Sequence, residues 1–108
     1  MGSYKVKIGS SASREIKKLD RQTQINVLEC LESMQNDPRP KGVEKLSQHP
    51  RLFRLRSGDY RIIYNVDDET AMIYVLVVRH RKEPYRGLQD LDTKLVAALL
   101  APTLPIAP

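Results

Sequence analysis

The stretch RLFRLRSGDYRIIYNV, residues 51–66, decides the fold of this 108-residue chain. Apolar and charged side chains alternate along it with a period of two, which is typical of strands. Arg54 and Arg56 therefore share one face of the first strand. Residues 57–59 interrupt the pattern, and Gly58 among them can adopt the positive φ that a tight turn requires. The stretch predicts two antiparallel strands joined by a hairpin.

A third strand is expected directly downstream of this hairpin. Residues 67–70 (DDET) form a short acidic turn, and residues 71–79 are almost all apolar. A run of that kind is typical of a strand covered on both faces. Because tight turns join antiparallel neighbours, the three strands are predicted to form an antiparallel meander.

Upstream of the hairpin the hydrophobic period changes twice. Residues 4–8 alternate apolar and basic side chains, which predicts a strand. Residues 12–19 carry a short helical stripe, and residues 25–34 carry a longer one. Asp20 between them is expected to break the first helix and to cap the second. The second helix must end before Pro38, because proline excludes the helical conformation from the residue before it.

The C-terminal part begins with a polar, basic loop over residues 80–87 and continues with another helical stripe. This stripe consists of Leu88, Leu91, Leu95, Val96 and Leu99. The complete order is β-α-α-β-β-β-α. It predicts the α+β class, with two N-terminal helices on one face of a small, mainly antiparallel twisted sheet. We expect one domain over residues 1–100 and a Pro-rich tail over residues 101–108.

The amino-acid composition suggests one kind of partner and excludes several kinds of site. Eighteen Lys and Arg residues against thirteen Asp and Glu residues give a net charge of +5, which suggests a polyanionic partner. One cysteine excludes an intrachain disulfide framework and a Cys-based zinc site, and two histidines cannot build a His-rich metal site. No apolar run approaches the roughly 20 residues of a membrane helix. A free thiol without a secretion-type N-terminus predicts a cytoplasmic location.

Arginines are the residues of chemical interest. The hairpin brings Arg61 back beside Arg54 and Arg56, and the next strand returns Arg79 and Arg81 to the same end of the sheet. The planar fork of arginine matches phosphate oxygens and keeps its charge, so a cleft lined by these residues suits a phosphodiester. The alternative is a solvated basic face. Arginines that recur inside otherwise apolar strands favour the cleft.

Other candidate sites have structural explanations. Cys30 lies in a helical stretch and is expected to pack, and His49 precedes a proline in a connector. The acidic pair Asp67 and Asp68 belongs to a turn. Neither a Gly-rich phosphate loop nor a nucleophile elbow is present, and no convincing carboxylate set for a two-metal nuclease can be found. We therefore expect any nuclease chemistry here to be metal-free.

Residues 54–64 (RLRSGDYRIIY) and 79–85 (RHRKEPY) together resemble RelE-type toxins of the RelE/ParE toxin–antitoxin superfamily. The resemblance covers residues 4–85, and the pair Arg81 and Tyr85 favours RelE-type over ParE-type members. It implies a RelE-like, microbial-RNase-type fold and cleavage of mRNA in the A site of the 70S ribosome, with no metal or cofactor. The 2′-hydroxyl would attack the adjacent phosphate and leave a 2′,3′-cyclic phosphate and a 5′-hydroxyl. The resemblance also implies a small, acidic, RelB-like antitoxin as partner.

The resemblance also assigns roles to residues. Arg61 would stabilise charge on the phosphate, Arg81 would act near the leaving oxygen, and Tyr85 would stack on a base or help to deprotonate the 2′-hydroxyl. Arg54 occupies a position that is basic in the family. His80 is a possible acid or base, although strand alternation places it opposite the neighbouring arginines. The expected RNA-binding residues are Arg56, Arg79, Lys82, Arg86 and Lys45.

One departure from the family pattern keeps alternatives open. Some RelE-type members carry a lysine where this chain has Leu52. A ParE-like inhibitor of DNA gyrase, which acts by protein–protein binding, is one alternative. A non-toxic homologue that only binds an antitoxin is the other. The C-terminal leucine stripe is expected either to pack on the sheet or to be displaced by the antitoxin.

Overall fold

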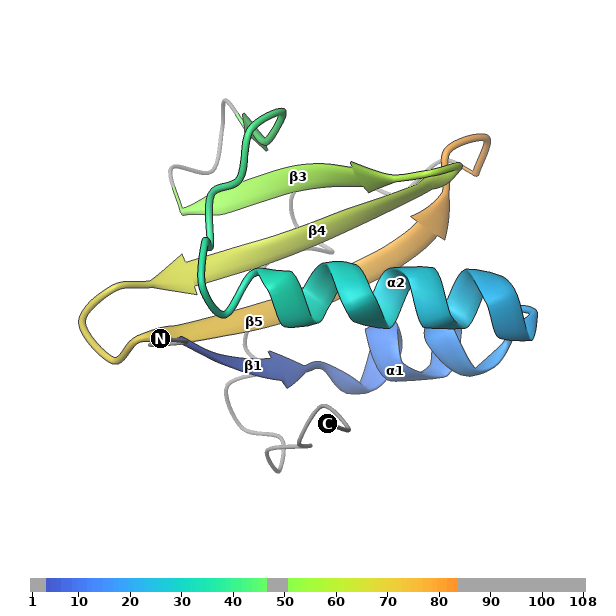
Figure 1. Cartoon of the computed structure of the whole chain (residues 1–108), viewed down its shortest axis with the longest axis horizontal. Helices are drawn as coiled ribbons and strands as arrows, with labels where there is room; N and C mark the ends of the chain where they lie inside the picture. The colour runs from blue at the N-terminus through green and yellow to red at the C-terminus, as the bar shows by residue number, and fades with distance from the viewer. Residues whose placement is uncertain (1–3, 47–50, 84–108) are drawn as a thin grey trace.

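The computed structural model describes residues 4–46 and 51–83, and these ranges form a five-stranded sheet with two helices (Figure 1). The elements are β1 (Lys5–Ile8), α1 (Ser10–Lys17), α2 (Arg21–Ser33), β2 (Glu44–Lys45), β3 (Leu52–Ser57), β4 (Tyr60–Asp67) and β5 (Met72–His80). The strand order is β1-β5-β4-β3-β2. The α+β class and the antiparallel meander β3-β4-β5 are confirmed. The predicted C-terminal helix, the tail and the domain boundary at residue 100 lie outside the described residues.

Two features of the sheet were not predicted. β1 pairs with β5 in parallel, so the sheet is mixed, with β5 between β1 and β4. β2 is a two-residue strand in the connector after α2, and it pairs antiparallel with β3. Both pairings join segments that are distant in the sequence, or too short to show a hydrophobic period. Neither can therefore be seen in the local pattern.

The two helices begin differently. Asp20 caps α2 as predicted, because its carboxylate accepts a hydrogen bond from the Thr23 backbone N–H at 3.3 Å. The Thr23 hydroxyl also donates to this carboxylate and is the main cause of the lowered pKa of Asp20. In α1, however, Gly9 is the N-cap residue and supplies no side-chain bond. Ser10 is already the first helical residue and therefore does not cap α1.

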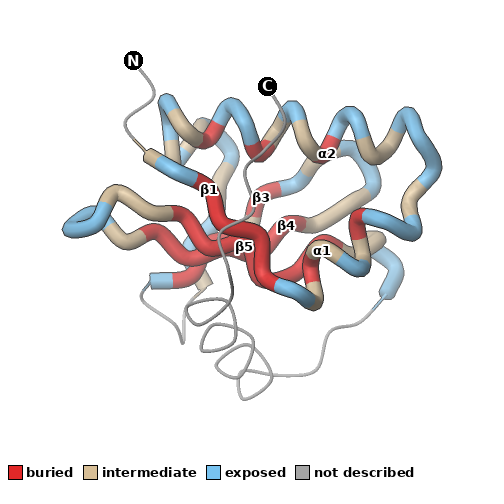
Figure 2. The backbone as a smooth tube through the Cα atoms, turned by 90° about the horizontal axis from the view of Figure 1, so that it is seen from below, coloured by how far each residue is buried: buried red, intermediate tan, exposed pale blue. Residues whose placement is uncertain are grey.

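The sheet is apolar on both faces. Helix residues such as Ile16 and Leu31 pack against one face, together with strand residues such as Ile62. A second cluster, centred on Ile63 and Val77, is buried on the opposite face. Figure 2 shows this buried sheet with both helices on one side of it. The expectation that the β5 stretch is covered on both faces is therefore confirmed.

Turns and connectors join this core to the rest of the described chain. Gly58 has φ +58° in the β3–β4 turn, as predicted. The buried Tyr64 hydroxyl donates to the Pro38 carbonyl at 2.8 Å and so ties the connector after α2 to the sheet. Burial raises the pKa of Tyr64 and keeps its hydroxyl protonated as a donor.

None of the helices within the described ranges has the length and hydropathy needed to cross a membrane.

Candidate nucleic-acid interface

Three predicted arginines come together on the face of the sheet opposite the helices. Cross-strand pairing places Arg56 directly opposite Arg61, and Arg54 lies two residues earlier on β3. With Gly42 and Glu44 of the connector, they line a hollow of about 180 Å³, here called the arginine pocket. The predicted shallow cleft therefore exists for these three residues, and the hairpin register creates it.

The three guanidinium groups differ in their partners. Arg54 Nη2 forms an ion pair with Glu44 Oε2 at 3.0 Å, and Arg56 Nε donates to the Gly58 carbonyl at 3.2 Å. Arg61 makes no hydrogen bond or ion pair with any residue in the described ranges. Three cations with one carboxylate leave the pocket positively charged. A phosphate is the anion whose geometry these forks match.

The pairing of β4 with β5 places Arg79 beside the arginine pocket, but the side chain of Arg79 is bonded to a residue of α1. It pairs across the sheet with Arg61, yet its Nε donates to Glu15 Oε2 of α1 at 3.0 Å. The other Glu15 oxygen accepts the Val78 backbone N–H at 3.1 Å. Glu15 thus accepts a hydrogen bond from a part of the β5 edge that β1 is too short to reach. Sequence reasoning missed this role, because Glu15 lies 64 positions from Arg79.

Arg81 is anchored at the tip of the β3–β4 hairpin. Its backbone N–H donates to the Asp59 carbonyl at 2.7 Å, and its Nε lies 3.3 Å from Asp59 Oδ1. The side chains of Arg81 and Asp59 are 44% and 65% exposed. Exposed ion pairs of this kind contribute only about 0–1 kcal/mol. A phosphate can therefore compete for Arg81 at little cost.

His80 lies on the opposite face from Arg61, as strand alternation predicts. Its ring contacts Tyr60 edge-to-face at 5.3 Å between centroids, and Tyr60 packs against the helix-side core. His80 Nδ1 accepts the Lys82 backbone N–H at 3.1 Å. The Lys82 side chain is exposed beyond the end of β5. This geometry gives His80 a structural role and does not place it in the arginine pocket.

Of the remaining predicted residues, Lys45 lies apart from this pocket, and two others fall outside the described part of the chain. Lys45 pairs with Phe53 and lines a different hollow, at the other end of the sheet. Tyr85 and Arg86 lie outside the described residues. Leu52, the position at which the resemblance implies a lysine, is 1% exposed within the second apolar cluster. The described residues contain no group of three or more His, Cys, Asp or Glu side chains arranged to hold a metal ion.

Comparisons with known proteins agree with this architecture. A family model described as the ParE toxin of the type II toxin–antitoxin system parDE matches residues 6–85, well over half of the chain. The chain belongs to the RelE/ParE superfamily of toxins. Toxin RelG of Mycobacterium tuberculosis is 30% identical to this toxin over 84 residues, which span 77% of this chain and 97% of RelG. The predicted superfamily is therefore confirmed, and the protein is a toxin of type II toxin–antitoxin systems.

Solved structures place the fold of this toxin among RelE proteins. A chain of the archaeal RelE–RelB complex from Pyrococcus horikoshii matches with a TM-score of 0.68 and 29% identity. The match covers 76% of this toxin and 99% of that chain. A chain of the RelBE2 complex from Mycobacterium tuberculosis has a TM-score of 0.66 and 28% identity, covering 73% and 99% respectively. The RelE-like fold predicted from the sequence is thereby confirmed.

Proposed function

We propose that this toxin is a ribosome-dependent, metal-independent mRNA endoribonuclease that cleaves in the ribosomal A site and inhibits translation in the cytoplasm. The observation that carries the proposal is the arginine pocket. Arg54, Arg56 and Arg61 converge there, and among the described lining residues Glu44 is the one carboxylate that opposes them. An inhibitor that acts only by covering a protein partner does not need this convergence. A phosphodiester in cleavage does, because negative charge builds on its oxygens.

The proposed reaction needs no group beyond RNA and protein side chains. The 2′-oxygen attacks the adjacent phosphorus while the bond from phosphorus to the 5′-oxygen breaks. The proton of the 2′-hydroxyl passes to a base, and the departing 5′-oxygen takes up a proton. The products are a 2′,3′-cyclic phosphate and a 5′-hydroxyl. General acid–base catalysis and charge stabilisation together supply the acceleration.

Arg61 is assigned to the charge that develops on the phosphate, because no described residue competes for its guanidinium. Arg54 and Arg56 hold the phosphate from the neighbouring strand. Arg81 is assigned to the leaving oxygen as an electrostatic stabiliser, because an arginine rarely releases its proton. Tyr85 is proposed as the base or as a stacking platform. A phenol acts as a base near neutral pH only where positive charge lowers its pKa.

The proposal includes an antitoxin as partner. Relatives of this toxin were solved as RelE–RelB and RelBE complexes, and these structures support a RelB-like antitoxin here. The net charge of +5 suits an acidic partner and predicts fast association that is sensitive to salt.

The test is pulsed expression of the full chain, with cut sites mapped by primer extension along an abundant transcript. Parallel cultures carry Arg61→Ala and Arg81→Ala. Arg21→Ala is the matched control, because it removes the same charge from an exposed position at the start of α2. We expect cuts within translated codons and at least a hundredfold loss in Arg61→Ala, as for the removal of one transition-state donor. Intact cleavage in both Arg61→Ala and Arg81→Ala would refute the assignment.

A second candidate is inhibition of DNA gyrase, and one specific observation favours it. The family model that matches residues 6–85 is that of the ParE toxin. Growth arrest without RNA cuts, accompanied by induction of a DNA-damage reporter, would support this candidate. Absence of arrest would instead indicate a non-toxic homologue that only binds an antitoxin.

A further inference from the structure

The two-residue turn between β3 and β4, formed by Gly58 and Asp59, holds two of the arginines predicted for the site. The Gly58 carbonyl accepts a hydrogen bond from Arg56 Nε at 3.2 Å. Asp59 contacts Arg81 twice, because its carbonyl accepts the Arg81 backbone N–H at 2.7 Å and its Oδ1 lies 3.3 Å from Arg81 Nε. Neither residue of the turn was among the predicted site residues.

The backbone bond between Asp59 and Arg81 continues the pairing of β4 with β5. Arg61 pairs with Arg79, and Asp59 and Arg81 each lie two positions further toward the same end of the sheet. Side chains two positions apart along a strand share a face. The register therefore assigns Arg81 to the same face as Arg61, which lines the arginine pocket.

The turn contacts both guanidinium groups at their inner nitrogen. Arg56 and Arg81 are each held through Nε, and no other residue in the described ranges forms a hydrogen bond or ion pair with either group. A guanidinium carries five N–H donors in a planar fork, and several of them can bond at once. Contact at Nε leaves the outer Nη nitrogens for the oxygens of a phosphate.

Asp59 also restricts a side chain that is otherwise exposed. The Arg81 side chain is 44% exposed, and a long side chain of this kind loses rotamer freedom when a ligand fixes it. Contact with Asp59 limits that freedom before RNA binds. Because an exposed ion pair is weak, Asp59 biases the orientation of Arg81 without blocking a phosphate.

We propose that Asp59 is a positioning residue of this toxin, which holds the Arg81 guanidinium by Nε and directs its Nη nitrogens to the leaving 5′-oxygen of the cleaved RNA. The inference rests on the proposed function for the role of Arg81 in cleavage. The anchoring of Arg81 by Asp59 does not depend on that function.

Asp59 is expected to affect binding and turnover in opposite directions. Its negative charge weakens the attraction of the site for RNA phosphates. Its contact with Arg81, in contrast, favours the orientation that the reaction uses. Asparagine suits turns as aspartate does, so Asp59→Asn should keep the hairpin. The variant should cleave more slowly while it binds RNA equally well or more tightly, whereas a misfolded chain would lose both properties.

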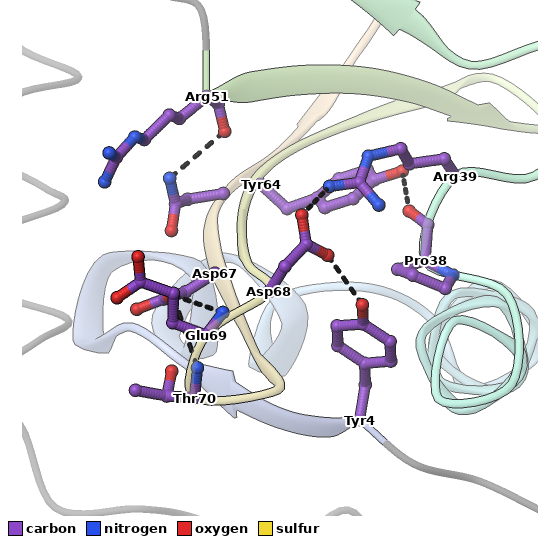
Figure 3. A network of polar contacts seen from close by, with 10 residues as sticks. Tyr4, Pro38, Arg39, Arg51, Tyr64, Asp67, Asp68, Glu69 and Thr70 are labelled. Atoms are coloured by element: carbon purple, nitrogen blue, oxygen red, sulfur yellow. Dashed lines mark hydrogen bonds and ion pairs between the residues drawn. The ribbon is translucent and has the colours of Figure 1, made fainter.

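Asp68 offers a matched control at the other end of β4. Its carboxylate forms an ion pair with Arg39 at 2.6 Å and also accepts the Tyr4 hydroxyl (Figure 3). The side chains of Asp68 and Asp59 are similarly exposed, at 58% and 65%. Asp68 lines a different hollow from the arginine pocket. Asp68→Asn therefore breaks a comparable arginine–aspartate pair outside the proposed site.

The experiment measures single-turnover cleavage of ribosome-bound mRNA by the purified full chain at several concentrations, all in excess. Asp59→Asn should lower the maximal rate about three- to tenfold, with an unchanged or lower half-saturating concentration. Asp59→Glu keeps the charge and should restore most of the rate. Added to Arg81→Ala, Asp59→Asn should cause no further loss of the residual rate, because both act through one contact. Asp68→Asn should cleave like the unmodified toxin.

A maximal rate in Asp59→Asn that equals or exceeds that of the unmodified toxin would overturn the proposal, because Asp59 would then only compete for Arg81. A further loss in the Arg81→Ala background would also overturn it, since Asp59 would then act through another group.

A second readout separates the proposal from the nuclease assignment. NMR spectroscopy follows hydrogen exchange of the Arg81 Nε–H group in the toxin without RNA. Exchange should be faster in Asp59→Asn and unchanged in Asp68→Asn, and equal exchange in all three chains would overturn the anchoring. If the unmodified chain never cuts RNA, the nuclease function fails, and the exchange rates still decide whether Asp59 holds Arg81.

Discussion

The arginine pocket and a second hollow beside β3 differ in their charges. The second hollow, here called the Phe53 groove, is lined by Arg39, Lys45, Arg51, Phe53, Val66 and residues 67–69. In the arginine pocket three guanidinium groups face one carboxylate, so a large positive charge is left for a ligand. In the Phe53 groove three basic and three acidic residues line the hollow, Arg39 and Asp68 among them form an ion pair, and the two apolar lining residues are almost buried. The first arrangement suits a polyanion. The second does not suit a polyanion, because its basic and acidic residues are equal in number.

The two hollows nevertheless share structural supports. Successive residues of β3 alternate between them, with Phe53 directed to one and Arg54 to the other. The connector after α2 supplies Arg39 to the groove and Gly42 to the pocket. A substitution can therefore affect one hollow, both, or the sheet beneath them. The predictions below distinguish these cases.

The largest effect is expected from Leu52→Lys. This substitution places a basic residue at the position where the resemblance implies one, two positions before Arg54 and on the same face. Leu52 is 1% exposed, so the new ammonium group would be buried among apolar side chains. We expect the free energy of unfolding to fall by about 3 kcal/mol or more, as measured by urea denaturation.

The matched variant is Leu52→Met, which should cost less than about 1.5 kcal/mol because it conserves volume and hydrophobicity. Unchanged stability of Leu52→Lys, accompanied by faster RNA cleavage, would contradict this account. It would show that the positive surface of the arginine pocket extends along β3 further than the burial of Leu52 indicates.

A smaller effect, on both hollows, is expected from Tyr64→Phe. The substitution removes the hydroxyl that donates to the Pro38 carbonyl and holds the connector to the sheet. The loss should be about 1 kcal/mol in the free energy of unfolding, typical of one neutral hydrogen bond. Hydrogen exchange should be faster at Gly42 and Val43, where the connector approaches the arginine pocket. Protection that is unchanged along residues 39–45 would show that other contacts hold the connector.

The smallest effect is expected from Asp68→Asn, and it should be confined to the Phe53 groove. Hydrogen bonds from Arg39 and from Tyr4 hold the pKa of Asp68 below its ordinary value. A carboxylate with a lowered folded-state pKa stabilises the fold above its unfolded-state pKa, and this contribution is lost as pH falls through the folded-state pKa. Asp68→Asn should therefore be slightly less stable at neutral pH, and its stability should fall less than that of the unmodified chain below about pH 4.

This pH dependence is measured by thermal unfolding from neutral to acidic pH. Asp37→Asn serves as the control, because it removes a carboxylate of the connector that forms no side-chain bond within the described residues. Equal pH profiles for Asp68→Asn and the unmodified chain would show that the pairing of Asp68 with Arg39 and Tyr4 contributes nothing to stability.

Contacts of the site between segments close in the sequence could be predicted, and contacts between distant segments could not. The hairpin at Gly58 sets the cross-strand pairing of Arg56 with Arg61, and this pairing could be predicted because two adjacent strands and their turn determine it. The carboxylates that pair with the arginines could not be predicted. Glu44 reaches Arg54 through a two-residue strand, and Glu15 reaches Arg79 from α1. Lys45 was predicted to act with the arginines, but its pairing with Phe53 places it on the other face.

The sequence by itself determined four of the five described strands, both described helices, the hairpin and the superfamily, because each is encoded in hydrophobic periods, turn residues and short motifs that act locally. Only the tertiary structure decided that β1 runs parallel to β5, that Glu15 covers the open edge of β5, and that Tyr4, Arg39 and Asp68 meet beside Phe53. These contacts join residues up to 67 positions apart, as in the pairing of Lys5 with Met72. They form only when the packing of the two helices on the sheet brings distant segments together, and no local pattern specifies which charges will then be neighbours.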